Sequence, residues 1–349
     1  MNRSLDQKTM LRPTTKDLAK SAGVSRATVD RVLNGREGVR QETVDRVNKA
    51  IAELGFVRNL QAANLARSQS YQFIFALPRS GDQFLGQIVR RIHEAETLFS
   101  ADHVWCDVHH INENDPHSIS AYLSSLSKTD VAGVAIMSPE SPQVRDAITR
   151  LQERGVATLP FISNQTLMDA DWVGIDNRAA GATAGLLLGQ FAGGRRGTLM
   201  VIAESMQSRD SLERRLGFDR EICENFPGLR ALPSLETYGN ADRARAIIGT
   251  SLAVHPDIVG IYIMASEART PLSIITDMRV PRSVIRIAHE RTPFTEQALR
   301  DRTLDGIIAQ DAGHLVRSAI RRLKGIVDRR KTLLSQEQIR IEILLRTNI

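Results

Sequence analysis

Apolar residues recur at helical spacing in the first 55 positions and predict three short helices. Thr14 and Asp17 fit a capping box at the start of the first helix, and Ser25 fits the N-cap of the second helix, 26–33. The third helix is expected over 41–54. The apolar residues that these helices turn toward one another are Leu18, Ala19, Ala22, Val29, Val32, Leu33, Val44, Val47, Ile51 and Leu54. One small helical core is therefore expected.

From position 71 onward, short apolar runs alternate with amphipathic helical segments. Strands are expected at 73–77, 104–108, 134–137, 158–162, 172–175, 198–202, 260–264, 284–288, 306–309 and 339–345. Helices are expected at 88–99, 144–154, 179–191, 209–225, 242–253, 267–278 and 312–329. Such alternation predicts parallel sheets in two α/β lobes. In lobes of this kind a ligand binds beyond the carboxyl ends of the strands, so the loops that follow the strands form the candidate site.

The net charge of the 349-residue chain is +6, and all of the excess lies in the helical segment. Residues 1–70 contain 13 Lys and Arg against 7 Asp and Glu, whereas the remaining 279 residues contain 33 of each. A basic module on a neutral body indicates contact with a polyanion, although a solvated basic tail gives the same balance. The tight turn Ala-Gly-Val-Ser at 22–25, which joins two helices, favours a helix-turn-helix that binds DNA.

The second helix of this pair is expected to enter the major groove of DNA. Arginine can bond to guanine and alanine can contact the thymine methyl group, so the residues that face away from the apolar side are the expected base readers. These residues are Arg26, Ala27 and Arg31. Short polar residues near the helix ends suit phosphate oxygens, which fix the register of the protein on DNA. These residues are Ser25, Thr28 and Asn34.

The run TTKDLAKSAGVSRATVDRVLNGREGVRQETVDRVNKAIAELGF at 14–56 resembles the amino-terminal domain of LacI-family bacterial transcriptional regulators. The resemblance implies an all-α helix-turn-helix headpiece, a hinge, and an α/β two-lobed effector domain like that of the periplasmic binding proteins. We expect a flexible N-terminal extension at 1–12 and the helix-turn-helix DNA-binding domain at 13–57. A hinge helix or linker is expected at 58–70, and the two-lobed effector-binding and dimerisation domain at 71–349. The family's hinge inserts a leucine from each subunit into the minor groove of DNA, and Leu65 occupies that position. A plain flexible linker is the alternative for this segment.

Two of the loops after expected strands carry groups suited to a polyhydroxylated ligand. Asp82 follows the first strand and can accept hydroxyl hydrogens, while the ring of Phe84 can stack on the C–H edges of a sugar. Ser138 and Glu140 follow the third strand, at the same edge of the sheet. These four residues are predicted to bind ligand.

The family resemblance places further ligand contacts at Arg214, Ser266, Glu267, Glu290, Gln310 and Asp311. At Ser266, Glu267 and Glu290 the residue replaces the one common in the family. An arginine at 214 can fork hydrogen bonds to hydroxyls or to an acid group, although solvation on a helix surface is the alternative. The segment 176–177 resembles another family element, and its expected role is to cap the helix that follows.

The sequence contains none of the common catalytic or metal-binding patterns that were sought. GxSxG, Walker A and HExxH are absent, and the histidines at 103, 109, 110 and 117 lack the i, i+4 spacing of a helical metal pair. Cys106 and Cys223 lie far apart without a CxxC partner, so neither a disulfide nor a thiolate metal site is expected. We expect no enzyme activity, no metal and no cofactor.

Composition and the amino terminus predict a cytoplasmic, nucleoid-associated protein. A hydrophobic content of 42% with 25% charged residues is typical of a soluble globular chain. No apolar run approaches the roughly 20 residues that span a bilayer, and the first residues lack the apolar region of a secretory signal.

The resulting hypothesis is a homodimeric transcription regulator, expected to act as a repressor, that binds a palindromic operator. A small ligand, expected to be a sugar, a polyol or a related carbon compound as for most relatives, would change its operator affinity allosterically. A tetramer is left open. The alternative is a cytoplasmic sugar-binding or sugar-modifying protein whose headpiece no longer works, which would show little salt-dependent affinity for DNA.

Overall fold

The computed structural model describes residues 13–33, 38–54, 56, 70–79, 81–164, 172–330 and 334–349. The chain divides into two compact units, Met1–Gln69 and Ser70–Ile349. The expected N-terminal extension and nearly all of the expected hinge lie outside the described residues.

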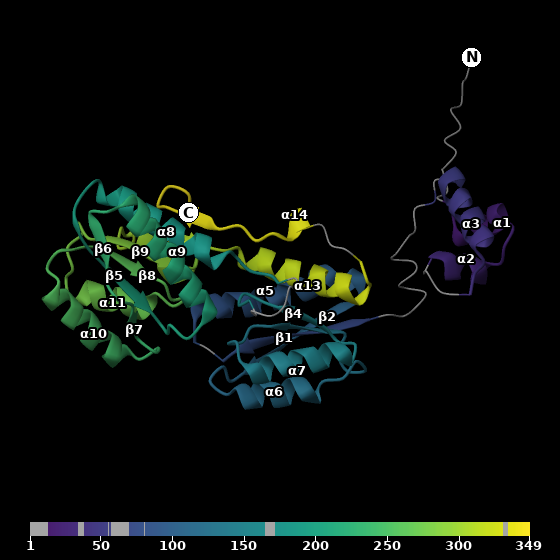
Figure 1. Ribbon diagram of the computed structural model, residues 1–349, viewed down its shortest axis with the longest axis horizontal. Helices are drawn as coiled ribbons and strands as arrows, with labels where there is room; N and C mark the ends of the chain where they lie inside the picture. Colours follow the sequence, from purple (N-terminus) through teal and green to yellow (C-terminus); the bar gives the residue numbers. More distant parts are fainter. Residues whose placement is uncertain are drawn as a thin grey trace, which may run out of the picture. The chain divides into compact units, whose positions relative to one another are not determined.

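The first unit contains the three predicted helices, α1 (Thr15–Ala22), α2 (Arg26–Leu33) and α3 (Gln41–Leu54) (Figure 1). Thr14 and Asp17 form the predicted capping box, in which the Thr14 backbone N–H donates to Asp17 Oδ2 at 2.8 Å. Gly23 follows α1 with φ 64°, a left-handed conformation that suits a residue without Cβ and turns the chain toward α2. The buried core comprises Leu18, Ala19, Ala22, Val29, Val47 and Ala50. Leu54, predicted to face this core, is instead exposed at the last position of α3.

The second unit holds two sheets whose main strands follow the predicted apolar runs. The first sheet has the order β2 (Val104–Ile111), β1 (Tyr71–Pro78), β3 (Gly133–Ile136) and β4 (Ala157–Pro160), all parallel. The second has the order β11 (Glu342–Leu344), β10 (Gly306–Ala309), β9 (Ile285–His289), β8 (Ile258–Ile263), β5 (Gly197–Ala203) and β6 (Leu229–Ala231), with β7 (Leu235–Glu236) also paired to β5. Its strands are parallel except β11, which runs antiparallel to β10 with Ile308 opposite Ile343. The predicted parallel sheets are confirmed apart from β11.

Helices cover both faces of each sheet (Figure 1). In the first lobe, α5 (Gln83–Phe99) and α13 (Ala312–Val327) lie on one face, and α6 (Pro116–Ser125) and α7 (Pro142–Glu153) on the other. In the second lobe, α8 (Asn177–Ala192) and α9 (Arg209–Asn225) lie on one face, and α10 (Ala241–Val254), α11 (Arg269–Asp277) and α12 (Pro293–Arg300) on the other. The short helix η1 (Ser100–Asp102) follows α5 in the chain, and the short helix α14 (Leu334–Glu337) follows α13.

The lobes are built from segments that are far apart in the sequence. α13 follows β10 of the second sheet, yet it packs against β3, β4 and α5 of the first lobe. The chain then returns to the second sheet as β11. Each lobe therefore depends on the late part of the chain as well as on its own strands.

Some elements differ from the prediction. The segment 172–175 forms no strand, and only an isolated bridge joins Val173 to Phe161, because Asp176 already caps α8. α6 and α12 were not predicted, although each begins at a proline directly after a polar cap, Asp115 and Thr292 respectively. In the described part of the chain, no helix has the length and apolar character needed to cross a membrane.

Candidate functional site

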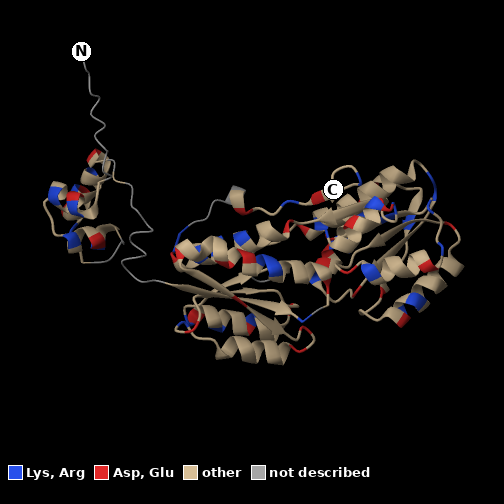
Figure 2. Cartoon of the chain, turned by 180° about the vertical axis from the view of Figure 1, so that it is seen from behind, with Lys and Arg blue, Asp and Glu red and all other residues tan. Residues whose placement is uncertain are grey.

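α2 has one buried side and one exposed side. Val29 is fully buried, and the exposed residues include the three predicted base readers, Arg26, Ala27 and Arg31. Ser25 caps the helix as predicted, because its Oγ accepts a hydrogen bond from the Thr28 N–H at 3.1 Å. Basic residues lie on the helices of this unit together with acidic ones (Figure 2). The other two DNA-binding candidates, Asn34 and Leu65, lie outside the described residues.

Arg214 on α9 lies at the centre of a second candidate site and is only 4% exposed. Its Nε donates to Asn177 Oδ1 at 2.9 Å, and its Nη1 donates to the carbonyl oxygen of Met264 at 2.8 Å. Its Nη2 lies 3.5 Å from Glu290 Oε1. Arg214 is therefore buried in a polar network, and the alternative of solvation on the helix surface is wrong.

The close packing of α8 against α9 holds the Arg214 backbone in this place. A Cβ on Gly181 would lie 1.8 Å from the Arg214 carbonyl oxygen, and a Cβ on Gly217 would lie 1.9 Å from that of Arg178. Both distances are far below contact, so only glycine permits the two helices to approach this closely.

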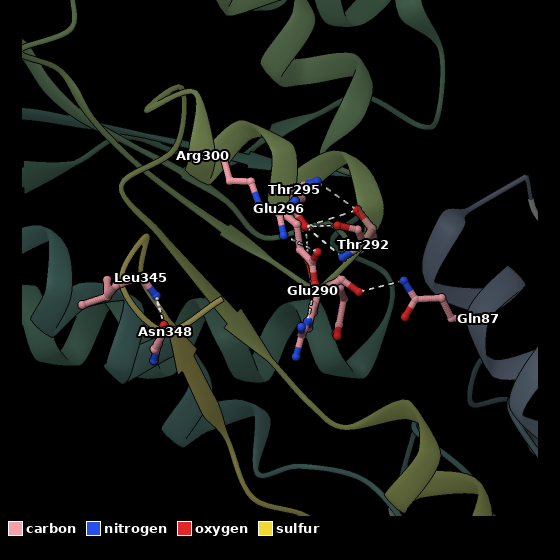
Figure 3. A network of polar contacts seen from close by, with 9 residues as sticks. Gln87, Glu290, Thr292, Thr295, Glu296, Arg300, Leu345 and Asn348 are labelled. Atoms are coloured by element: carbon pink, nitrogen blue, oxygen red, sulfur yellow. Dashed lines mark hydrogen bonds and ion pairs between the residues drawn. The ribbon is translucent and has the colours of Figure 1, made fainter.

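Glu290, directly after β9, is 1% exposed and shares the network. Gln310 Nε2 donates to the Oε1 of Glu290 at 2.9 Å. Thr295 Oγ1 donates to the backbone oxygen of Glu290 at 2.8 Å (Figure 3). Burial raises the pKa of Glu290 to about 7, although Arg214 opposes the shift. Within the described residues, neither Glu290 Oε2 nor Gln310 Oε1 has a hydrogen-bond partner, so the network leaves two buried oxygen atoms unsatisfied.

Asp82 connects the first lobe to the second. Its Oδ1 accepts from the Phe84 N–H at 2.6 Å and so caps α5, while its Oδ2 accepts from Ser266 Oγ of the second lobe. Phe84 is only 2% exposed and belongs to the apolar core with Ile88. The expectation that the Phe84 ring faces a ligand is not met in this structure, because the first turn of α5 directs the ring toward the sheet.

Three predicted residues that follow strands of the two sheets are engaged by other groups. Glu140 pairs with Arg145 at 3.0 Å and with Arg209 of the second lobe at 3.8 Å. Glu267 accepts from Arg269 through both carboxylate oxygens, at 2.9 and 3.3 Å. Asp311 is exposed and caps α13, because its Oδ1 accepts from the His314 N–H at 2.8 Å. Ser138, at the end of β3, is 2% exposed.

The sequence interpretation missed the contribution of Asn177. Asp176 caps α8 as predicted, with its Oδ1 accepting from the Ala179 N–H at 2.9 Å. Asn177 itself is 3% exposed and orients Arg214. Its position next to the α8 cap Asp176, at the carboxyl edge of the second sheet, is the sequence feature that could have indicated this role.

A further buried polar pair lies beneath this site. His289 is fully buried, and its Nε2 lies 2.6 Å from the hydroxyl of Tyr262. Burial lowers the pKa of His289 well below its ordinary value, so its ring is neutral next to Arg214 and Glu290.

The first turns of α5 also contact the second lobe. Gln87 Nε2 donates to the Arg291 carbonyl oxygen at 2.9 Å (Figure 3), and the Phe294 N–H donates to Gln83 Oε1 at 3.4 Å. Direct polar contacts therefore join the two lobes around the predicted ligand site.

Comparisons with known proteins agree with this architecture. Residues 14–59 match the family of bacterial regulatory proteins called the lacI family, and residues 73–331 match the periplasmic binding protein domain. The HTH-type transcriptional regulator RegA of Clostridium saccharobutylicum is 34% identical over 136 residues, which are 39% of this chain and 39% of RegA. Catabolite control protein A of Staphylococcus xylosus is 28% identical over 38% of this chain and 40% of its own length. The matched part thus spans about two fifths of these curated relatives.

Solved structures share the fold of the second unit at low sequence identity. A putative LacI transcriptional regulator from Bacteroides fragilis superposes with a TM-score of 0.70 and 20% identity over 80% of this chain and 98% of the other. GanP, a glucose-galactose binding protein from Geobacillus stearothermophilus, gives 0.69 and 16% over 80% of this chain and 99% of the other. The predicted family resemblance is confirmed: the chain belongs to the periplasmic binding protein domain family over most of its length and carries a lacI-family bacterial regulatory domain at its amino-terminal side.

Proposed function

We propose that this chain is a transcription regulator that binds DNA through α2 and changes its DNA affinity when a small ligand binds between the lobes. The observation that carries the proposal is the exposure of Arg26 and Arg31 on one side of α2, in a segment that matches the lacI family. On its other side, α2 packs into the core of the unit through the buried Val29. RegA, one of the curated relatives named above, is described as an HTH-type transcriptional regulator, and we assign no reaction to the chain.

α2 has the features that a major-groove reader needs. Its first turn is capped by Ser25, and its exposed residues begin at Arg26. An arginine there can donate two parallel hydrogen bonds to guanine O6 and N7. A homodimer would present two copies of α2 to two half-sites, so the proposal includes a palindromic operator, with repression in the cytoplasm as the expected action.

The buried network around Glu290 supports a ligand that carries several hydrogen-bond donors. Glu290 Oε2 and Gln310 Oε1 are buried acceptors without partners in the described residues, and hydroxyl groups would satisfy them. A sugar or polyol supplies such hydroxyls, and the structural neighbour GanP is described as a glucose-galactose binding protein. We therefore propose a polyhydroxylated ligand.

Ligand binding would compete with contacts that join the lobes directly. Ser266 bonds to Asp82, and Arg209 lies 3.8 Å from Glu140. Replacing such contacts by contacts to a ligand changes the relative free energies of lobe arrangements, and couplings of this kind typically amount to about 1 to 3 kcal/mol.

The test is selection of DNA from a pool of random duplexes by the purified full chain, at several salt concentrations and without ligand. A palindromic motif, with an affinity that falls steeply as salt rises, is the expected result. Retention of DNA without an enriched motif, or no salt-dependent retention at all, would refute the regulator and leave the alternative of a sugar-binding protein.

A further inference from the structure

A cavity with a volume of about 420 Å³ lies in the first lobe, at the carboxyl end of β2. Its wall is formed by the residue that follows β1, the last residues of β2, the loop after β2, and α6. None of the lining residues belongs to the network of Arg214 and Glu290. The volume falls within the roughly 300 to 1,000 Å³ of sites that bind small molecules. This lobe therefore has room for a small molecule apart from the Arg214 network.

Two stacked rings and a backbone contact build the wall of this cavity. The ring of His109 on β2 lies flat on that of Tyr122 on α6, with the centroids 3.5 Å apart and the planes within 4° of each other. The Arg79 N–H donates to the backbone oxygen of the buried Ile111 at 3.1 Å, which holds the chain after β1 against the end of β2. The cavity is thus formed by packed elements of the lobe before any ligand arrives.

Arg79 brings an uncommitted positive charge to the cavity. The side chain is exposed, and in the described part of the chain it forms neither an ion pair nor a hydrogen bond. Burial lowers the pKa of His109, and the charges of His110 and Arg79 lower it further, so the guanidinium lies near the stacked rings. A guanidinium donates hydrogen bonds in a planar fork that matches the two oxygens of a carboxylate. This part of the cavity is suited to a carboxylate group.

Glu113 brings the opposite charge to the same cavity. The side chain is half-buried, and among the described residues it has no ion-pair or hydrogen-bond partner, Arg79 included. Desolvation raises the pKa of Glu113, and the charge of Asp82 adds to the shift. A cation bound beside Glu113 would oppose both effects. Asn112 Oδ1 accepts from the Asn114 N–H at 3.2 Å and so orders the loop that carries Glu113.

We propose that this cavity binds a free α-amino acid, with its carboxylate on Arg79 and its ammonium group on Glu113. A ligand with one charge would leave one of these two side chains without a partner, whereas a zwitterion satisfies both. The Asn112 amide and the Ser118 hydroxyl line the same cavity and offer polar contacts to the side chain of the amino acid. This site goes beyond the proposed function, because it shares no residue with α2 or with the Arg214 network.

Isothermal titration calorimetry on the full chain, with the standard amino acids as probes, tests the ligand class. The amino acid that binds most tightly is then compared with its α-amide, which lacks the carboxylate charge, and with its N-acetyl derivative, which lacks the ammonium group. We expect each derivative to bind about tenfold more weakly than the parent, since each loses a hydrogen bond to a charged side chain. The inference is overturned if no amino acid binds, or if either derivative binds as tightly as the parent.

Nearly isosteric variants assign each charge of the ligand to its partner. Arg79→Gln should weaken the amino acid about tenfold and leave the affinity for the α-amide unchanged, because the amide lacks the group that Arg79 binds. Glu113→Gln should likewise weaken the amino acid and leave the affinity for the N-acetyl derivative unchanged. Arg91→Gln and Glu94→Gln, which alter an exposed ion pair on α5, are the controls and should change none of these affinities. Variants at Arg79 and Glu113 that bind the amino acid as tightly as the natural chain, or that weaken parent and derivative equally, would refute the proposed site.

Discussion

Nη2 of Arg214 and Oε1 of Glu290 lie 3.5 Å apart, although both side chains are almost completely buried. A direct charge-assisted hydrogen bond between such groups is typically about 2.7 to 2.9 Å long, so the pair is loose. Gln310 approaches the same oxygen more closely, at 2.9 Å. The carboxylate is thus only partly compensated, which is consistent with its raised pKa and leaves it able to bind a further donor.

Replacing Arg214 by alanine should destabilise the protein and abolish its response to ligand. Arg214→Ala removes the donors to Asn177, to Met264 and to Glu290, and it leaves a buried carboxylate uncompensated. The expected loss in the free energy of unfolding is about 3 kcal/mol, measured by urea denaturation at pH 8.

Arg220→Ala on the same helix is the matched control. Arg220 forms an exposed pair with Glu224 at 3.0 Å, and such pairs contribute at most about 1 kcal/mol. If both variants lose equally little stability, the Arg214 network does not support the fold.

Replacing Glu290 by glutamine should change the pH dependence of stability. The pKa of Glu290 is raised from its ordinary value of 4.5 to about 7, mainly by burial, so the folded state holds a proton that the unfolded state releases. The contribution of this group is therefore fully present below pH 4.5 and is lost as pH rises toward 7, at up to about 1.4 kcal/mol per pH unit. Glu290→Gln resembles the protonated form and removes this loss.

Thermal unfolding from pH 5 to pH 8 tests this prediction. The difference in Tm between Glu290→Gln and the natural chain should be near zero at pH 5 and should grow in favour of the variant as pH rises. The Tm of Glu224→Gln should follow that of the natural chain throughout. A difference that does not grow with pH would show that Glu290 titrates normally.

Features fixed by neighbouring residues were predictable from the sequence. The capping box of Thr14 and Asp17 and the cap at Asp176 each depend on residues within three positions, so local reasoning found them. The buried strands were found because parallel strands covered on both faces are continuous apolar runs. The return of α13 to the first lobe has no local signal, because its apolar face would fit either sheet.

The sequence could nominate candidate site residues one by one, but not the contacts that they make with one another. Arg214, Glu290 and Gln310 were proposed separately and converge in the structure. Phe84 was assigned to the ligand because its position in the loop was weighed above its helical spacing to Ile88, which places both in the core. Asn177 was missed because its role depends on an arginine 37 positions away.

Adding a methyl group at Gly181 should disrupt the contact of α8 with α9. The new Cβ would lie 1.8 Å from the Arg214 carbonyl oxygen, so the helices must separate and Arg214 must move. Overpacking of this kind costs about 1 to 3 kcal/mol, which Gly181→Ala should show as a lower Tm together with weaker ligand binding.

Gly86→Ala on α5 is the control, because a Cβ there meets nothing within 4 Å. Alanine is the better helix former by about 1 kcal/mol, so this variant should be neutral or slightly stabilised. If Gly181→Ala behaves in the same way, the close approach of α8 and α9 is not required.

Replacing Arg26 or Arg31 by alanine should weaken binding to the selected operator far more than binding to random DNA. Both side chains are exposed on α2, and loss of a bidentate contact to guanine costs about 1 to 3 kcal/mol on the specific site. Arg46→Ala, an exposed arginine of the same unit on α3, removes the same charge outside α2 and should reduce binding to both DNAs by a similar small factor. Fluorescence anisotropy at fixed salt gives both affinities. Equal losses on operator and random DNA for Arg26→Ala and Arg31→Ala would mean that the two arginines contact phosphates, and base recognition would then have to come from another part of the unit.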